Sequence, residues 1–204
     1  METHSKIKTK PNISKEEVLK EIYSLQPIKS YLNKTEKIRT LANNIRERYF
    51  SGNYSLQEKI ERFALQGIGY KFIYTRKNIP YEIDGVNYII KYHFSEGIIR
   101  QKNYIDMLHL CIHIYKKHTT THEFGRLLYD NEYIKNSEHE AFFLAKEIIT
   151  PFEGLLDKIA ELYSERGRIN VEELSYEDAS YNSLRLYGLG LEKYIDLNYD
   201  VFKY

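Results

Sequence analysis

The period of the apolar residues changes twice along this chain, and these changes constrain the fold more than any other feature of the sequence. Apolar residues recur at helical spacing before Gly69. Between residues 69 and 99, segments rich in aromatic and β-branched residues predict two or three short strands. Helical spacing returns after Arg100. Helices, a small sheet and further helices in that order predict an α+β fold with a small sheet packed by helices.

Local signals indicate where the elements begin and end. Ser14 with Glu17, and Ser55 with Glu58, have the spacing of capping boxes, which open helices. The Asp84-Gly85 dipeptide predicts a turn between strands. Together with the apolar spacing, these signals predict helices over residues 15–25, 28–50, 55–67, 103–117, 138–149 and 152–165, and a short helical tail near 178–188.

Composition narrows the class of protein. Apolar residues make up 42% of the 204 residues, which is enough for a core, and no apolar stretch predicts a membrane span or a signal peptide. The single cysteine, Cys111, cannot form an intramolecular disulfide. We therefore expect a cytoplasmic protein with no membrane contact.

The N-terminal quarter of the chain is basic. Residues 1–50 carry 11 Lys and Arg against 6 Asp and Glu, whereas the remainder of the chain is net acidic. Such a segment can contact nucleic acid or an acidic partner, or it can simply be a solvated surface. The sequence has no recognisable DNA-binding helix pair, which makes nucleic acid the less favoured partner. We expect a basic N-terminal tail and helical extension over residues 1–50 and a folded domain over residues 51–204.

Five of the seven histidines fall between residues 109 and 139, and two frames within this window have the spacing of a zinc-peptidase helix. The first frame is T-H-E-F-G-R, in which His122 precedes Glu123. Arg126 occupies the second ligand position of this frame, and a guanidinium cannot bind zinc. The segment is also polar, which favours a loop or the start of a short helix over a metal-binding helix.

The second frame is H-L-C-I-H, and it contains both ligands. His109 and His113 lie four residues apart in an apolar helix, so that they share one face and can bind one zinc ion. A second apolar helix opens downstream with Glu138 and Glu140. A carboxylate from a second helix commonly completes a His-His-Glu zinc site and leaves a fourth position for water.

Two segments of this chain, RQKNYIDMLHLCIH and EHEAFFLAKEIITP, resemble the paired signatures of the ImmA/IrrE family of zinc metallopeptidases. His113 and Glu138 are separated by 25 positions, as in that family, whereas Arg126 and Glu138 are separated by 12. The segments SLQEKIERFALQGIGYKFIY and DASYNSLRLYGLGL are also similar to the family's lead-in helix with its first strand and to its late helix. The resemblance covers roughly residues 55–191 and leaves the first 50 residues unexplained.

The resemblance implies a zincin-like metallopeptidase fold with zinc bound by His109, His113 and Glu138. Glu140 is the alternative third ligand if the register is shifted by two residues. Leu110 stands where the family has its catalytic glutamate, and Leu110 can neither accept nor return a proton.

The missing base leaves several functions open. The chain can be an active zinc endopeptidase acting on a transcriptional repressor, with Asp106 or Glu123 as the replacement base. It can instead be a pseudoenzyme that uses the same fold to bind a protein partner, which the apolar Leu110 favours. Without a metal, the paired histidines would be ordinary helix-face residues. Cys111 lies on another face of the helix and is expected to be a small core residue.

Overall fold

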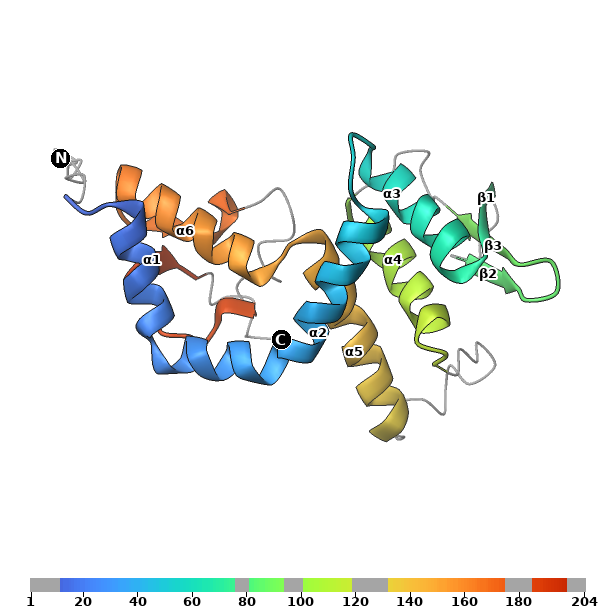
Figure 1. The fold of residues 1–204 in the computed structure, drawn as a ribbon, viewed down its shortest axis with the longest axis horizontal. Helices are drawn as coiled ribbons and strands as arrows, with labels where there is room; N and C mark the ends of the chain where they lie inside the picture. Colours follow the sequence, from blue (N-terminus) through green and yellow to red (C-terminus); the bar gives the residue numbers. More distant parts are fainter. Residues whose placement is uncertain (1–11, 76–80, 94–100, 119–131, 175–184, 198–204) are drawn as a thin grey trace, which may run out of the picture. The chain divides into compact units, whose positions relative to one another are not determined.

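The computed structural model describes residues 12–75, 81–93, 101–118, 132–174 and 185–197 (Figure 1). Within these segments the protein has the predicted α+β composition, with six α-helices and a small mixed sheet. The chain divides into two compact units, of which the first combines residues 1–36 with residues 150–204 and the second comprises residues 37–149. The boundary predicted at residue 50 does not coincide with this division.

The first unit is built on the packing of α1 (Lys15–Ser24) against α6 (Phe152–Arg166), together with the first part of α2 (Gln26–Tyr49). Figure 1 shows α1 in blue and α6 in orange. The predicted capping box opens α1, because the Ser14 side chain accepts a hydrogen bond from the backbone N–H of Glu17 and the Glu17 carboxylate accepts one from the N–H of Ser14.

The chain after α6 contributes to the core of this unit. Strand β4 (Ile169–Asn170) pairs in parallel with β5 (Ile195–Asp196). The predicted helical tail near 178–188 lies mostly outside the described residues, and its last part includes the helical Arg185 and Leu186. The buried apolar core includes Val18, Ile22, Ile28, Phe152, Leu155, Leu156, Ile159, Ile169, Leu186, Leu191 and Ile195.

The second unit contains a three-stranded sheet. Its strands are β1 (Lys71–Thr75), β2 (Tyr81–Asp84) and β3 (Ile89–His93), in the order β1-β3-β2. Strand β3 runs parallel to β1 and antiparallel to β2, which confirms the predicted strands. The predicted turn is also present, since the Asp84 carboxylate accepts hydrogen bonds from the backbone N–H groups of Val86 and Asn87. After α2, the elements of this unit are α3 (Leu56–Phe63), the π-helical turn η1 (Ala64–Ile68), β1 (Lys71–Thr75), β2 (Tyr81–Asp84), β3 (Ile89–His93), α4 (Gln101–Tyr115) and α5 (Glu132–Ile149).

Helix α4 is buried around most of its circumference and carries its polar side chains along one strip. Leu108 and Ile112 are fully buried in a core to which α3, β3 and α5 also contribute, the last through Leu144. Since successive residues are rotated by about 100°, His109 and His113 share one face of the helix, on which His113 is buried and His109 is partly exposed. The apolar residues of α4 therefore fix the helix against its neighbours and orient the two histidines.

Several predicted helix ends differ from the structure by one or more residues, and two of these differences have a clear local cause. Helix α5 begins at Glu132, six residues before the predicted start at 138. The helical segment predicted to end at Gly67 continues through the π turn to Gly69, whose φ of 78° forms the left-handed cap. Gly67 is needed for packing, because a Cβ there would lie 2.7 Å from the Phe63 ring. Among the described residues, no helix combines the length and apolar character that a bilayer span requires.

Candidate metal centre

His109 and His113 lie one turn apart on α4, and their Nε2 atoms approach each other. The ring centroids are 4.6 Å apart and the two Nε2 atoms are 3.0 Å apart. The spacing of four residues on a helix produces this arrangement without help from other elements. The structure therefore brings together the pair that the H-L-C-I-H frame predicted.

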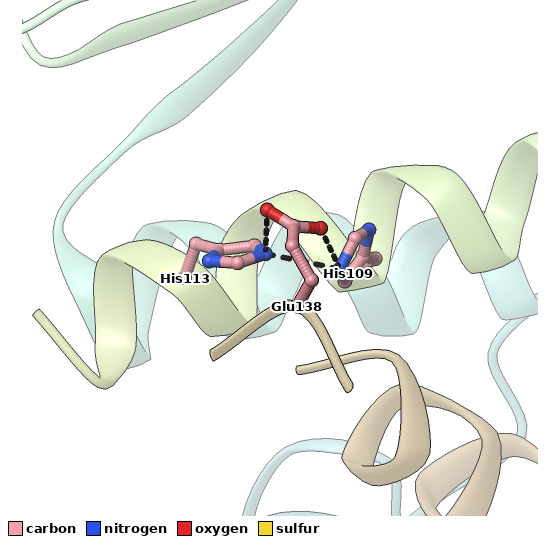
Figure 2. A group of neighbouring side chains, drawn as sticks. All are labelled: His109, His113 and Glu138. Atoms are coloured by element: carbon pink, nitrogen blue, oxygen red, sulfur yellow. Dashed lines mark hydrogen bonds and ion pairs between the residues drawn. The ribbon is translucent and has the colours of Figure 1, made fainter. Parts of the chain in front are cut away.

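Glu138 reaches both imidazoles from α5 (Figure 2). Its Oε2 lies 3.3 Å from His109 Nε2, and its Oε1 lies 3.3 Å from His113 Nε2. Figure 2 shows the carboxylate bridging the two rings, with one oxygen directed to each. The three ligand atoms lie within 4.8 Å of one another, so this group can hold a metal ion.

Glu140, the alternative third ligand, makes different contacts. Its Oε1 lies 2.8 Å from Lys116 Nζ, and its Oε2 lies 3.4 Å from His118 Nε2. Partial burial favours the neutral form of Glu140, but the hydrogen bond and charge of Lys116, together with His118, hold the pKa of this carboxyl below its usual range. Glu140 is thus an ionised neighbour of the group, and Glu138 is the carboxylate that meets the two imidazoles.

Both imidazoles are in the protonation state that metal binding requires, because burial keeps them neutral. Burial lowers the pKa of His109 to about 4, with a further contribution from the charge of His113. Burial and the charge of His118 likewise lower the pKa of His113 to about 4. Only a neutral imidazole has a lone pair to donate to a metal. The carboxylate is more accessible, since the side chain of Glu138 is 53% exposed, against 23% for His109 and 8% for His113.

These pKa values predict that the metal-free protein loses stability as the pH falls from about 6.5 towards 4. An unfolded chain protonates both histidines near pH 6.5, whereas the folded chain keeps them neutral down to about pH 4. Within this window each histidine contributes up to about 1.4 kcal/mol of lost stability per pH unit. Urea unfolding of chelator-treated protein at a series of pH values measures this slope. The His109→Ala/His113→Ala variant should have a shallower slope, and equal slopes would contradict the prediction.

The C-terminal turn of α4 brings a third histidine to the group. Lys117 adopts a left-handed conformation with φ of 55°, and the backbone N–H of His118 donates to the carbonyl of His113 at 2.9 Å. The N–H of Lys117 donates to the carbonyl of Ile114 at 3.0 Å, which completes a Schellman motif. This turn places His118 Nδ1 3.2 Å from His113 Nδ1, on the side of the ring away from Glu138.

Tyr81 and Asp106 lie within electrostatic range of the group. Burial raises the pKa of Tyr81, and the negative charges of Glu138 and Asp106 raise it further. Asp106, which the sequence offered as a replacement base, is therefore near the site. The sequence did not identify Tyr81, because only the folding of β2 brings it there. His118 lies within the histidine-rich window, and its place at the end of a helix, five residues after His113, is the sequence signal for its position.

Leu110, at the position of the family's catalytic glutamate, is 5% exposed and packs in the core of the second unit. Cys111 is fully buried in the same core, as predicted, and burial raises the pKa of its thiol. His122, Glu123 and Arg126 of the rejected frame lie outside the described residues.

No protein-family model, curated protein sequence or solved structure matches this chain. The similarity to the ImmA/IrrE family thus rests on the quoted motifs alone and stays a prediction. What the structure adds is independent of any family: two neutral imidazoles and one carboxylate, contributed by two helices, form a group that can hold a metal ion.

Proposed function

We propose that this chain is a zinc-binding protein with a zincin-like fold of the ImmA/IrrE type. The site that corresponds to the family's catalytic centre binds a protein partner and hydrolyses peptide bonds poorly or not at all. The observation that carries the proposal is the meeting of His109, His113 and Glu138 at hydrogen-bond distance. The resemblance to the family suggests a transcriptional repressor as the partner.

The distances between the ligand atoms support zinc. Zinc binds nitrogen and oxygen at about 2.0–2.1 Å in tetrahedral geometry, which places neighbouring ligand atoms about 3.3–3.4 Å apart. In this group the two Nε2 atoms are 3.0 Å apart, and each lies 3.3 Å from a different oxygen of the Glu138 carboxylate. Two imidazoles with one carboxylate are also a donor set that catalytic zinc sites use, whereas calcium and magnesium prefer oxygen ligands alone.

Three protein ligands leave a fourth position for water or for a group from a partner. The half-exposed Glu138 makes the carboxylate side of the site the accessible one. A bound zinc ion would acidify a water in this position and polarise a carbonyl group. A partner's carboxylate, imidazole or backbone carbonyl can occupy the same position without being cleaved.

The apolar Leu110 favours binding over hydrolysis, because a positioned general base contributes about 10²–10⁴-fold to such a reaction. An active endopeptidase is the second candidate, and one observation favours it. Asp106 and Tyr81 lie close enough to act on each other electrostatically, with Glu138 also in range. In this alternative His109, His113 and Glu138 would hold the zinc, Asp106 would accept a proton from the attacking water, and Asp106→Asn would abolish any zinc-dependent hydrolysis.

Metal content tests the proposal directly. Purified wild-type protein should contain about one zinc per chain by elemental analysis, since the three ligands form one site. The His109→Ala/His113→Ala variant should contain none. His139→Ala is the matched control, because His139 is an exposed histidine next to Glu138 that the site does not use. It should retain the zinc.

A wild-type protein that is folded but takes up no zinc, even after incubation with excess zinc and dialysis, would overturn the proposal. Zinc that remains in the double variant would place the metal elsewhere and would overturn it equally. Circular dichroism of each variant establishes that a loss of metal does not reflect a loss of fold.

A further inference from the structure

A chain of contacts runs from the candidate metal group into the neighbouring side chains. His113 Nδ1 lies 3.2 Å from His118 Nδ1. On the far side of the His118 ring, Nε2 lies 3.4 Å from Glu140 Oε2. Lys116 Nζ contacts the other oxygen of Glu140 at 2.8 Å. The side chain of His118 is only 8% exposed, so its contacts are with protein.

When a metal is bound, a single placement of protons satisfies every contact from His113 through His118 to Glu140. A metal held by His113 through Nε2 would use that lone pair, which would leave the ring proton on Nδ1. His113 Nδ1–H then donates to His118 Nδ1, which must be the unprotonated nitrogen of that ring. The proton of His118 is accordingly on Nε2, from which it donates to the Glu140 carboxylate at 3.4 Å.

We propose that His118 and Glu140 are positioning residues that fix the ring orientation and tautomer of His113 for zinc binding. This inference rests on the proposed zinc site. Metal-binding histidines usually donate their second ring N–H to a carboxylate, a carbonyl or water. Here a histidine is inserted between the ligand and the carboxylate. Glu140 makes His118 a better acceptor, and this strengthens the bond that orients His113.

These contacts also explain why α4 ends in a left-handed turn at a residue that is not glycine. A non-glycine residue in the left-handed region costs about 1–2 kcal/mol, and Lys117 occupies it with φ of 55°. The resulting turn brings His118 back over His113, with ring centroids 5.1 Å apart. In most Schellman motifs the corresponding positions make an apolar contact. In this chain they make the hydrogen bond that supports the ligand.

Zinc affinity tests the inference, measured by competition with a chromophoric chelator at neutral pH. His118→Ala should weaken zinc binding about 10–100-fold, because His113 loses its partner. His118→Asn should lose less, since the amide oxygen can accept near the position of Nδ1. Glu140→Gln should fall between the wild type and His118→Ala. Because Glu140 acts through His118, the His118→Ala/Glu140→Gln double variant should bind zinc no more weakly than His118→Ala alone.

The visible absorption of the cobalt-substituted protein gives a second readout that a loss of stability would not produce. Its ligand-field bands should shift in His118→Ala and return towards the wild-type spectrum in His118→Asn. Lys117→Gly is the matched control, because glycine adopts the same turn without strain. It should leave both affinity and spectrum unchanged.

The possible failures are distinguishable. If the wild type binds no zinc, the proposed function fails and the inference fails with it. If the wild type binds zinc and His118→Ala binds it equally well with an unchanged cobalt spectrum, only the inference is overturned. Additive losses from His118→Ala and Glu140→Gln would also overturn it, because they would show that Glu140 does not act through His118.

Discussion

Replacing Leu110 with glutamate should raise zinc-dependent peptide hydrolysis about 10²–10⁴-fold above the wild-type rate. The substitution restores a carboxylate directly after the first histidine, which is the position of the general base in the H-E-x-x-H helix. Leu110 lies at the border of the polar face of α4, about 60° around the helix from His113. A bound zinc ion close to this position would stabilise the ionised carboxylate despite the low exposure of residue 110. An internally quenched peptide library measures the rate.

Leu110→Gln is the matched control for this experiment, because glutamine has the shape of glutamate without its basicity. Both variants must be shown to be folded and loaded with zinc before their rates are compared. Equal inactivity of two folded, zinc-loaded variants would contradict a zincin-like cleft while leaving the metal site intact. Substantial zinc-dependent hydrolysis by the wild type, lost in Asp106→Asn, would instead support the endopeptidase alternative.

The sequence predicted those parts of the fold that depend on local chemistry. Both capping boxes formed at the serines that the sequence indicated, Ser14 and Ser55. The turn at Asp84 formed because its side chain bonds to the backbone only two and three residues ahead. Each of these signals is complete within a few residues, so no knowledge of the rest of the chain is needed to interpret it.

The errors at helix ends arose where local signals were absent or ambiguous. Residues 132–136 of α5 are mostly polar, and its described apolar side chains begin at Ala141, so periodicity gave no sign of the earlier start. A glycine at position 67 is typical of a helix cap, but in the structure Gly67 allows the Phe63 ring to lie close to the backbone. The true cap is Gly69, two residues later.

Long-range organisation was not predictable from the order of elements. The sequence suggested an N-terminal extension, whereas the structure combines α1 with α6 in one unit. The ion pair between Lys15 and Asp157, at 2.8 Å, joins residues that lie 142 positions apart and belong to no common sequence motif. At the site, helical spacing was enough to predict the two histidines. Tyr81 depends on the sheet, and no pattern in the sequence indicates it.

Removing zinc should destabilise the second unit by about 4 kcal/mol relative to protein with free zinc at about 1,000 times the dissociation constant. The expected loss is unevenly distributed along α5. From Ala141 onwards, buried apolar residues such as Leu144 hold this helix in the core that it shares with α4. At its preceding turn, Glu138 and Glu140 are not buried, and both contact polar side chains of α4 or the turn that follows it. Bound zinc would hold the Glu138 turn of α5 against α4.

Hydrogen exchange with and without chelator measures this distribution. Amides near residues 136–141 and 112–118 should exchange faster when zinc is removed, and those around Leu144 should change less. The core of the first unit, which contains none of the three ligands, should be the least affected. The His109→Ala/His113→Ala variant provides the control, because its exchange should not respond to zinc. A uniform response along α5, or one as large in α1 and α6, would mean that zinc acts through global stability and that the Glu138 turn is held by other contacts.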